Sequence, residues 1–147
     1  MPQDMGGLPI NLPQTFDTAL ETTFSATGTD DWTILTLNLL PGAYIITTNL
    51  TFTPTASAQT PNFSLKTGVP IFGPNTNPGT FLAVTSVTTS AAGNHHCLAL
   101  SAFSVLLVPT AVSVVVRPQV ASGISMLATT ATVATPGATR LSAMRVG

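Results

Sequence analysis

The chain has very few charged side chains. Its 147 residues include four Lys and Arg and five Asp and Glu, 6% of the sequence, and the formal net charge is −1. An ordinary soluble domain contains about 25% charged residues. Charge repulsion therefore gives this protein little protection against self-association. We expect partner molecules to cover much of its surface.

The scarcity of basic residues argues against nucleic-acid binding. The four cations, Lys66, Arg117, Arg140 and Arg145, are separated in the sequence, whereas nucleic-acid binding normally begins with a basic patch that displaces counterions. Long apolar runs are also missing: the longest, Ala102–Val108, is far shorter than the roughly 20 residues of a membrane-spanning helix. We predict neither a nucleic-acid partner nor a membrane partner.

Cysteine is almost absent, because Cys97 stands alone and cannot form a disulfide within the chain. This suits a reducing compartment. We expect Cys97 to be a small buried apolar residue. The opening sequence MPQDMGGLPINLPQ lacks a basic start and a continuous apolar core, so it does not resemble a secretory signal. Synthesis in the cytoplasm is expected.

Residues 1–14 are predicted to form an extended arm. Three prolines and a Gly-Gly pair in this segment oppose helix and favour extended backbone. Leu8, Ile10 and Leu12 alternate with proline and asparagine, so one apolar side can lie along a neighbouring molecule as an added strand or strap. A frayed terminus is the alternative.

Residues 15–147 are predicted to form a single all-β domain. Val, Leu, Ala and Ile are scattered among many Thr and Ser, and runs typical of helical bundles are missing. Short strand-forming runs separated by turn residues have the spacing of a sandwich or barrel. About eight to ten strands are expected, enough for two sheets. The main expected strands are Asp31–Leu39, Ala43–Thr53, Phe63–Lys66, Phe81–Thr89, Cys97–Val108, Val112–Arg117, Ile124–Val133 and Thr139–Val146.

The clearest strand pattern lies in Ala43–Thr53. Its large side chains occupy alternate positions, which is typical of a half-buried antiparallel strand. They are Tyr44, Ile46, Leu50 and Phe52. The Ala and Leu content of Leu98–Leu107 also permits a helix, but the flanking β-rich pattern favours a strand.

Three short motifs occur in order along the chain. They are Pro41-Gly42-Ala43-Tyr44 at the entry to a central strand, Leu106-Leu107-Val108-Pro109 before Val112–Val116, and Thr139–Val146 as a terminal strand. Their order resembles the jelly-roll domains of the tumour necrosis factor and complement globular-head superfamily, including similar modules in bacteriophage virion proteins. The resemblance spans Phe16–Gly147. It implies an antiparallel, ten-stranded jelly-roll sandwich that assembles as a threefold trimer around one apolar sheet face.

Aromatic side chains are candidates for that trimer axis. Trp32, Tyr44, Phe52, Phe81 and Phe103 are expected to fill the sandwich core or the axis, because aromatics bury large areas in both places. A ligand cleft is the alternative. Tyr44 and Phe52 are assigned to the subunit interface.

Two arginines and the arm complete the predicted interface. Arg140 and Arg145 are an odd number of residues apart and therefore lie on opposite faces of a strand. One of them is expected to form an intersubunit ion pair with Asp17 or Glu21. The arm contributes Leu8, Ile10 and Leu12.

Candidate catalytic and metal-binding residues do not form a recognisable site. On a strand, His95 and Cys97 point to one side and His96 to the other, whereas a closed zinc site needs four ligands. Asp30 and Asp31 follow Gly-Thr and are expected in a turn. The chain has no Gly-x-Ser-x-Gly elbow, phosphate-binding loop or dinucleotide fingerprint. We predict no enzyme activity, no metal and no cofactor.

The leading interpretation is a noncatalytic bacteriophage structural protein. It is expected to be a trimeric capsid decoration, or cementing, protein, made in the host cytoplasm and located on the capsid surface of the virion. Its expected partners are its own copies, the major capsid protein and neighbouring decoration subunits. The alternative is a receptor-binding or fibre-tip module of a tail or head fibre, in which loop residues of Gly73–Gly79 contact a host glycan or surface protein.

Overall fold

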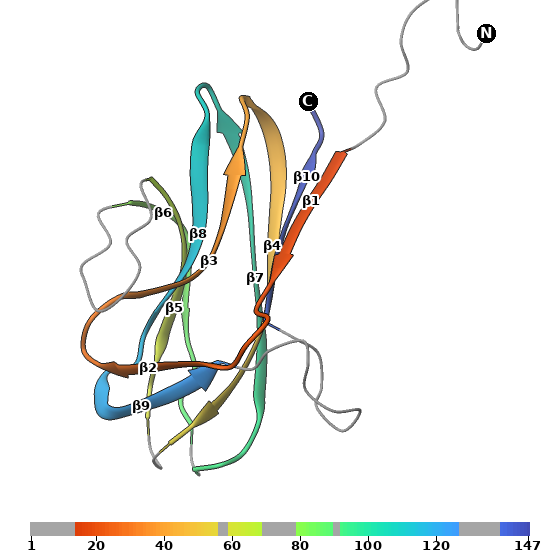
Figure 1. Cartoon of the computed structure of the whole chain (residues 1–147). Coiled ribbons are helices and arrows are strands. Elements are labelled where there is room, and N and C mark those ends of the chain that lie inside the picture. The colour runs from red at the N-terminus through yellow and green to blue at the C-terminus, as the bar shows by residue number, and fades with distance from the viewer. Residues whose placement is uncertain (1–13, 56–58, 69–78, 90–91, 127–138) are drawn as a thin grey trace, which may run out of the picture.

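A computed structural model of the chain is a sandwich of two antiparallel sheets (Figure 1). The structure describes residues 14–55, 59–68, 79–89, 92–126 and 139–147. These residues form ten strands and no helix. None of them therefore forms a helix long and apolar enough to cross a membrane.

The strands follow one another along the chain without an intervening helix. They are β1 (Gln14–Ala19), β2 (Phe24–Gly28), β3 (Trp32–Leu39), β4 (Gly42–Pro54), β5 (Asn62–Thr67), β6 (Thr80–Ser86), β7 (His96–Leu106), β8 (Thr110–Arg117), β9 (Val120–Met126) and β10 (Arg140–Arg145). The larger sheet has the order β1-β10-β4-β9-β2, with β7 also paired to β4, and the smaller has the order β3-β8-β5-β6. This is the predicted two-sheet jelly-roll sandwich.

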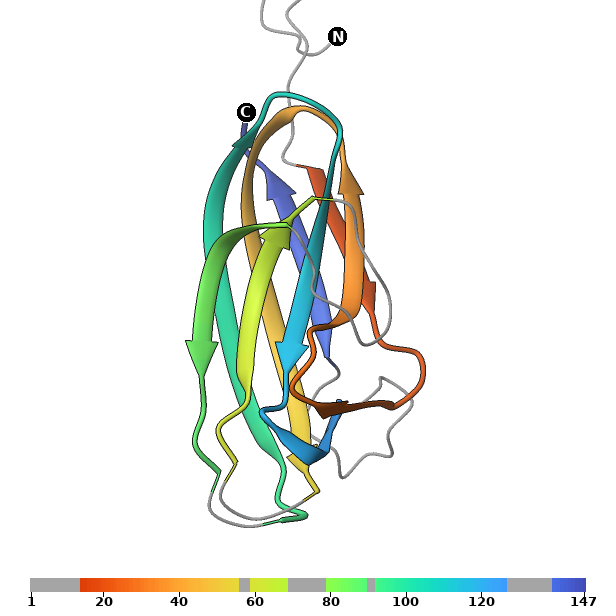
Figure 2. The same cartoon turned by 90° about the vertical axis from the view of Figure 1, so that its left-hand side faces the viewer.

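The long strand β4 organises the larger sheet. One side of β4 pairs with β7 along residues 42–52. The other side pairs first with β10, along residues 44–49, and then with β9, along residues 52–54. As a result β7 and β1 lie at opposite borders of the upper part of this sheet, as Figure 2 shows.

The hydrophobic core lies between the sheets. The alternation in β4 is confirmed, since Tyr44, Ile46, Leu50 and Phe52 are all at most 1% exposed. They pack with buried side chains of β5 and β8, namely Phe63, Leu65, Val112, Val114 and Val116. Complete burial of each such side chain contributes about 1.5 to 3 kcal/mol.

Several boundaries differ from those expected from the sequence. Gln14 is the first residue of β1 rather than part of the arm. Neither β1 nor β2 is among the strands expected from the sequence. Leu98–Leu107 falls almost wholly in β7, so the strand interpretation is confirmed. Residues Leu107–Pro109 join β7 to β8, and the two strands lie in different sheets.

Gly123 allows β9 to approach β2 closely. Its φ is +75°, and a Cβ atom there would lie 2.0 Å from the carbonyl oxygen of Ala26. We expect Gly123→Ala to lower the free energy of unfolding by more than about 3 kcal/mol, because the backbone of β2 must move. Urea denaturation measures the loss.

Gly93→Ala is the matched control for this prediction. Gly93 also has a positive φ, +79°, but a Cβ atom there meets nothing within 4 Å. Its substitution should cost only about 1 to 2 kcal/mol, the penalty of the left-handed conformation. Equal losses for the two variants would contradict the importance of the contact with β2.

Candidate interaction surface

Exposed apolar side chains gather on the outer side of the larger sheet. Phe103 in β7 is 64% exposed and Val105 is 57% exposed. Phe103 pairs with Ile45 of β4, which in turn pairs with Met144 of β10. Val146, just after β10, is 48% exposed beside them and bonds to β4 through its backbone. We call these five residues the apolar face.

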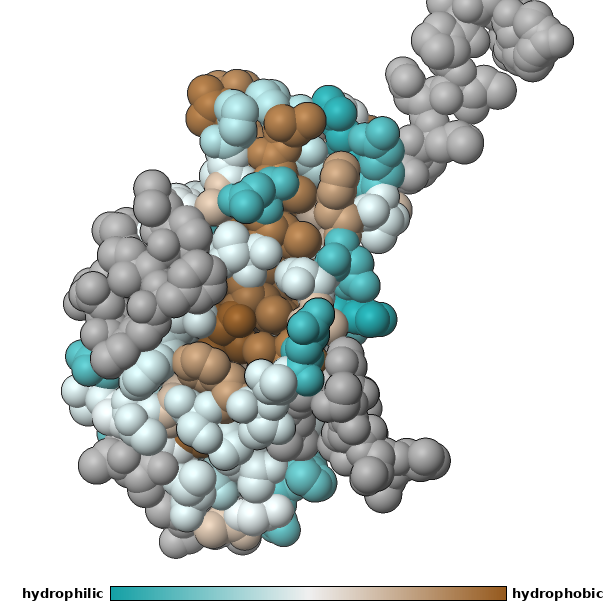
Figure 3. Space-filling model, in the orientation of Figure 1, coloured by the Kyte–Doolittle hydropathy of each residue, from teal (hydrophilic) through white to brown (hydrophobic). Residues whose placement is uncertain are grey.

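The apolar face continues to one end of the sandwich. Leu40 in the β3–β4 turn and Leu107 and Val108 in the β7–β8 turn are strongly exposed. Figure 3 shows hydrophobic surface at this end of the molecule and also down the middle of the same view. The apolar face and this tip hold all the exposed large hydrophobic side chains of the described residues except Phe81 and Val84 of β6. Such a concentration is typical of a surface that another molecule covers.

The border strand β7 lacks the features that usually protect the edge of a sheet. It has 11 residues and no Asp, Glu, Lys, Arg or Pro, and its pairing with β4 continues without a register shift. Proteins commonly protect sheet edges by short strands, charges, prolines or bulges. The other border strands have such features: β1 has six residues including Asp17, while β2, β3 and β6 have register shifts in their pairings. Among the strands described, β7 is therefore the one best suited to pair with a further strand.

Two predicted interface residues lie in the core instead. Tyr44 and Phe52 are both 0% exposed. The Tyr44 hydroxyl donates to the carbonyl of Leu40 at 2.9 Å, and the Phe52 ring lies 4.9 Å from that of Phe63. Their assignment to a subunit interface is wrong, because their strand directs these side chains between the two sheets. The arm residues Leu8, Ile10 and Leu12 lie outside the described residues.

The two predicted interface arginines bond within their own chain. The Nε atom of Arg140 lies 3.3 Å from Oδ2 of Asp17, so Asp17 is a partner as expected but the pair joins β10 to β1 within one molecule. The guanidinium of Arg145 donates to the carbonyl oxygens of Pro41 and Gly147 at 2.9 and 3.3 Å. These bonds fasten the carboxyl-terminal strand and do not require a partner.

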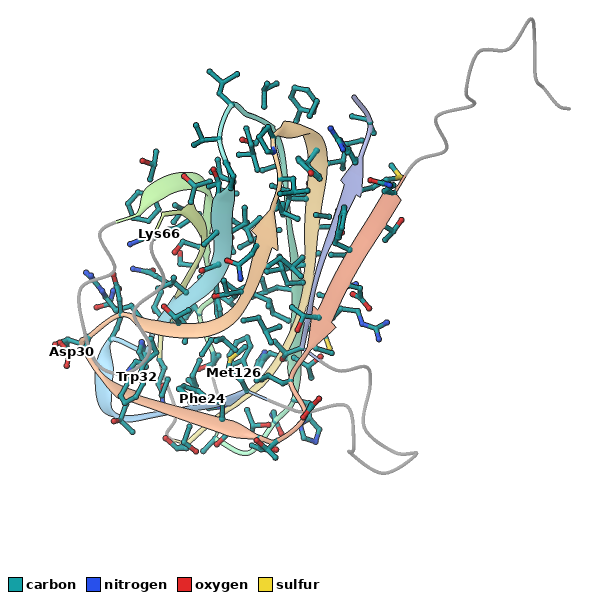
Figure 4. The ribbon with its side chains drawn as sticks, turned by 45° about the horizontal axis from the view of Figure 1, so that its top comes forward. Phe24, Asp30, Trp32, Lys66 and Met126 are labelled. Atoms are coloured by element: carbon teal, nitrogen blue, oxygen red, sulfur yellow. The ribbon has the colours of Figure 1, made fainter. Side chains whose placement is uncertain are left out.

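The remaining aromatic side chains divide between core and surface. Trp32 is half-buried against Phe24, with ring centroids 5.6 Å apart, and Figure 4 shows both beside Met126 at the end of the sandwich. Phe81 and Phe103 are 59% and 64% exposed, so neither fills the core. Of the two, Phe103 lies on the apolar face.

A buried ion-pair cluster was not predicted from the sequence. The Asp31 carboxylate accepts from Nζ of Lys66 at 3.3 Å and from Nε of Arg117 at 2.7 Å. Lys66 also lies 4.4 Å from the centroid of the Phe81 ring. Asp30 is exposed in the bend before β3, as expected for a turn residue (Figure 4). The adjacent carboxylates thus have different environments, and Asp31 joins β5 and β8 to the start of β3.

The His-His-Cys run does not assemble a metal site in the described residues. Nδ1 of His95 lies 2.9 Å from Oγ1 of Thr53, and the His96 ring stacks on Phe52 at 5.3 Å. Cys97 is exposed, which corrects the expectation that it is buried, because its position in β7 faces outward. Elsewhere in the described part of the chain, too, no three His, Cys, Asp or Glu side chains are close enough to hold a metal.

No protein family and no curated protein matches this sequence. Solved structures with the same fold do. A structure of infectious bursal disease virus Gx strain gives a TM-score of 0.58 at 12% identity over 92% of this chain and 32% of that one. The D431N mutant VP2 protein of the same virus, from derived T=1 particles, gives 0.54 at 12% identity over 92% and 32%.

A non-viral protein also has this architecture. Eiger TNF from S. frugiperda gives a TM-score of 0.50 at 12% identity over 74% of this chain and 61% of that one. The chain thus spans about a third of the length of the viral proteins it matches and less than two thirds of the TNF protein. These similarities show that the chain shares the jelly-roll fold of these proteins.

Proposed function

We propose that this protein is a noncatalytic structural component of a virus particle, specifically a homotrimeric decoration protein on the capsid of a bacteriophage. The observation that carries the proposal is the apolar face and tip on a surface with little charge. A protein that remains a separate molecule in water gains nothing from such a surface. The fold shared with a viral VP2 protein from T=1 particles supports the same assignment.

In the proposed assembly, three copies cover one another's apolar faces around a threefold axis. Closed cyclic oligomers are the common way to remove such surface from water. The trimer then binds the major capsid protein and neighbouring decoration subunits, so that contacts spanning several capsomers reinforce the shell. This role requires stable surfaces and no reacting group.

Cryo-electron microscopy of the particle that carries this protein tests the proposal. We expect trimeric density distributed over the capsid, with the apolar face turned toward the threefold axis. Density restricted to a fibre or tail tip would overturn the decoration role and favour the receptor-binding alternative. Monomeric density with the apolar face in solvent would overturn the trimer.

A further inference from the structure

We propose that the free edge of β7 binds residues 8–12 of a second copy of the chain as an added antiparallel strand. The inference rests on the self-association in the proposed function, and it names the segment and the strand that make the contact. Three independent observations carry it: the direction of the backbone groups of β7, the pattern of residues 8–12, and the position of Gln14.

The first observation fixes which β7 residues face the free edge. The Ala43 N–H donates to the Gly147 carbonyl at 2.8 Å, and the Ala43 carbonyl accepts from the Val146 N–H at 2.8 Å. The Thr51 N–H donates to Thr139 Oγ1 at 3.3 Å. The backbone N–H and C=O groups of the odd-numbered residues of β4 therefore point away from β7. Those of the even-numbered residues point toward β7, because the direction of these groups alternates along a strand. The even-numbered residues of β7 are their register partners.

The odd-numbered residues of β7 therefore direct their N–H and C=O groups to the free edge. They are Cys97, Ala99, Ser101, Phe103 and Val105. The side chains of the same five residues point to the outer side of the sheet, where all five are exposed. In an antiparallel pair, residues that exchange hydrogen bonds have their side chains on the same face. A strand that pairs with β7 must therefore combine a backbone N–H and an apolar side chain at alternate positions.

Residues 8–12 have this combination. Leu8, Ile10 and Leu12 are apolar, alternate, and each has a backbone N–H. When these three face β7, their side chains lie beside Phe103 and Val105 on the outer side. The prolines at positions 9 and 13 belong to the other alternate set, so their missing N–H groups face away from β7, where no partner is needed. Pairing then ends at an edge that proline protects from further strand addition.

Charge does not oppose this contact. Residues 5–13 contain no Asp, Glu, Lys or Arg, and neither does β7. No ionised side chain loses its water when the two segments meet, which removes the main cost of burying polar surface. The backbone hydrogen bonds supply affinity and the apolar side chains supply register, as in other cases of strand addition.

The position of Gln14 requires the donor to be a second copy. Gln14 begins β1, and β10 and β4 lie between β1 and β7. Neighbouring strands are about 4.8 Å apart, so a strand added outside β7 lies roughly 19 Å from β1. Leu12 is two residues before Gln14 and can reach only about 7 Å from it. The contact is head-to-tail, and it closes into a ring when the rotation between copies allows, including the proposed ring of three.

Two proline substitutions in the full chain test the proposal by sedimentation equilibrium. Ile10→Pro removes an N–H that faces β7, whereas Asn11→Pro removes one that faces away. We expect Ile10→Pro to weaken association between copies at least tenfold and Asn11→Pro to change it less than threefold. Equal effects of the two substitutions, or no effect of either, would overturn the inference. Both positions precede β1, so circular dichroism should show an unchanged fold for both variants.

Disulfide trapping tests the same contact by covalent capture. In a Cys97→Ser background, chains with Ile10→Cys are mixed with chains carrying a cysteine at Ala99, Ser101 or Phe103, and oxidised. We expect a covalent heterodimer for at least one of the three positions, and none with Asn11→Cys as the matched control. Copies that associate but form no such disulfide would overturn the strand addition while leaving the capsid role intact. Trapped copies that fail to bind capsids would instead contradict the proposed function.

Discussion

Replacing Asp31 with asparagine is expected to lower the free energy of unfolding by about 3 to 5 kcal/mol. The side chains of Asp31 and Lys66 are only 7% and 5% exposed, and the carboxylate also bonds to Arg117. Removing one member of a buried ion pair leaves the other charge uncompensated in a poorly solvated site. Urea denaturation with an unchanged m-value measures the loss.

Asp30→Asn is the control for this substitution. It removes the same charge one residue earlier, from an exposed position, and surface substitutions of this kind usually change stability by less than about 0.5 kcal/mol. A double variant, Asp31→Asn with Lys66→Met, should lose less stability than the sum of its single variants, because the ammonium that has lost the Asp31 carboxylate is gone as well. A loss below about 1 kcal/mol for Asp31→Asn would show that the cluster is structurally unimportant.

Replacing Phe103 with lysine is expected to weaken self-association at least tenfold. Phe103 is the most exposed residue of the apolar face, at 64%. Burying a phenylalanine side chain contributes about 1.5 to 3 kcal/mol, and every 1.4 kcal/mol is a factor of ten in affinity. Lysine removes that contribution and also places a charge in an apolar contact. Sedimentation equilibrium measures the association, and urea denaturation should show a stability close to that of the original chain.

Val84→Lys is the matched control on the other sheet. Val84 is 58% exposed and lies on β6 of the smaller sheet. The Val84→Lys substitution adds the same charge at a similarly exposed strand position, so a general effect of net charge would appear in both variants. If Val84→Lys weakened association as much as Phe103→Lys, the apolar face would not be the contact surface. An original chain that stayed monomeric at all concentrations would refute the proposed assembly.

The strands with strong local patterns were predictable from the sequence. In β4 the large residues Tyr44, Ile46, Leu50 and Phe52 all occupy even-numbered positions, and the inward face follows from that spacing, although Ile45 and Thr48 depart from the pattern. β7 was assigned correctly although Leu98–Leu107 also permits a helix, because the flanking segments favour strands. β1 and β2 were not named, since QTFDTA and FSATG are short and only partly apolar. Their strand conformation depends on pairing with β10 and β9.

The candidate surface was less predictable than the fold. Tyr44 and Phe52 suggested an interface because aromatic residues occur both in cores and at contacts, and sequence alone does not separate the two. Asp31 looked like an ordinary turn residue, since its partners Lys66 and Arg117 are 35 and 86 residues away. Exposure of Phe103 also depends on β7 being a border strand, which requires the order of strands in the sheet.

The sequence by itself determined an all-β chain with a poorly charged surface, because composition and two-residue periodicity act locally and depend on no distant contact. The tertiary structure alone decided which apolar side chains remain outside. Strand order made β7 a border, brought Ile45, Phe103 and Met144 into one row, and placed Asp31 between two cations. These outcomes depend on pairing between residues far apart in the chain, for which the local pattern contains no information.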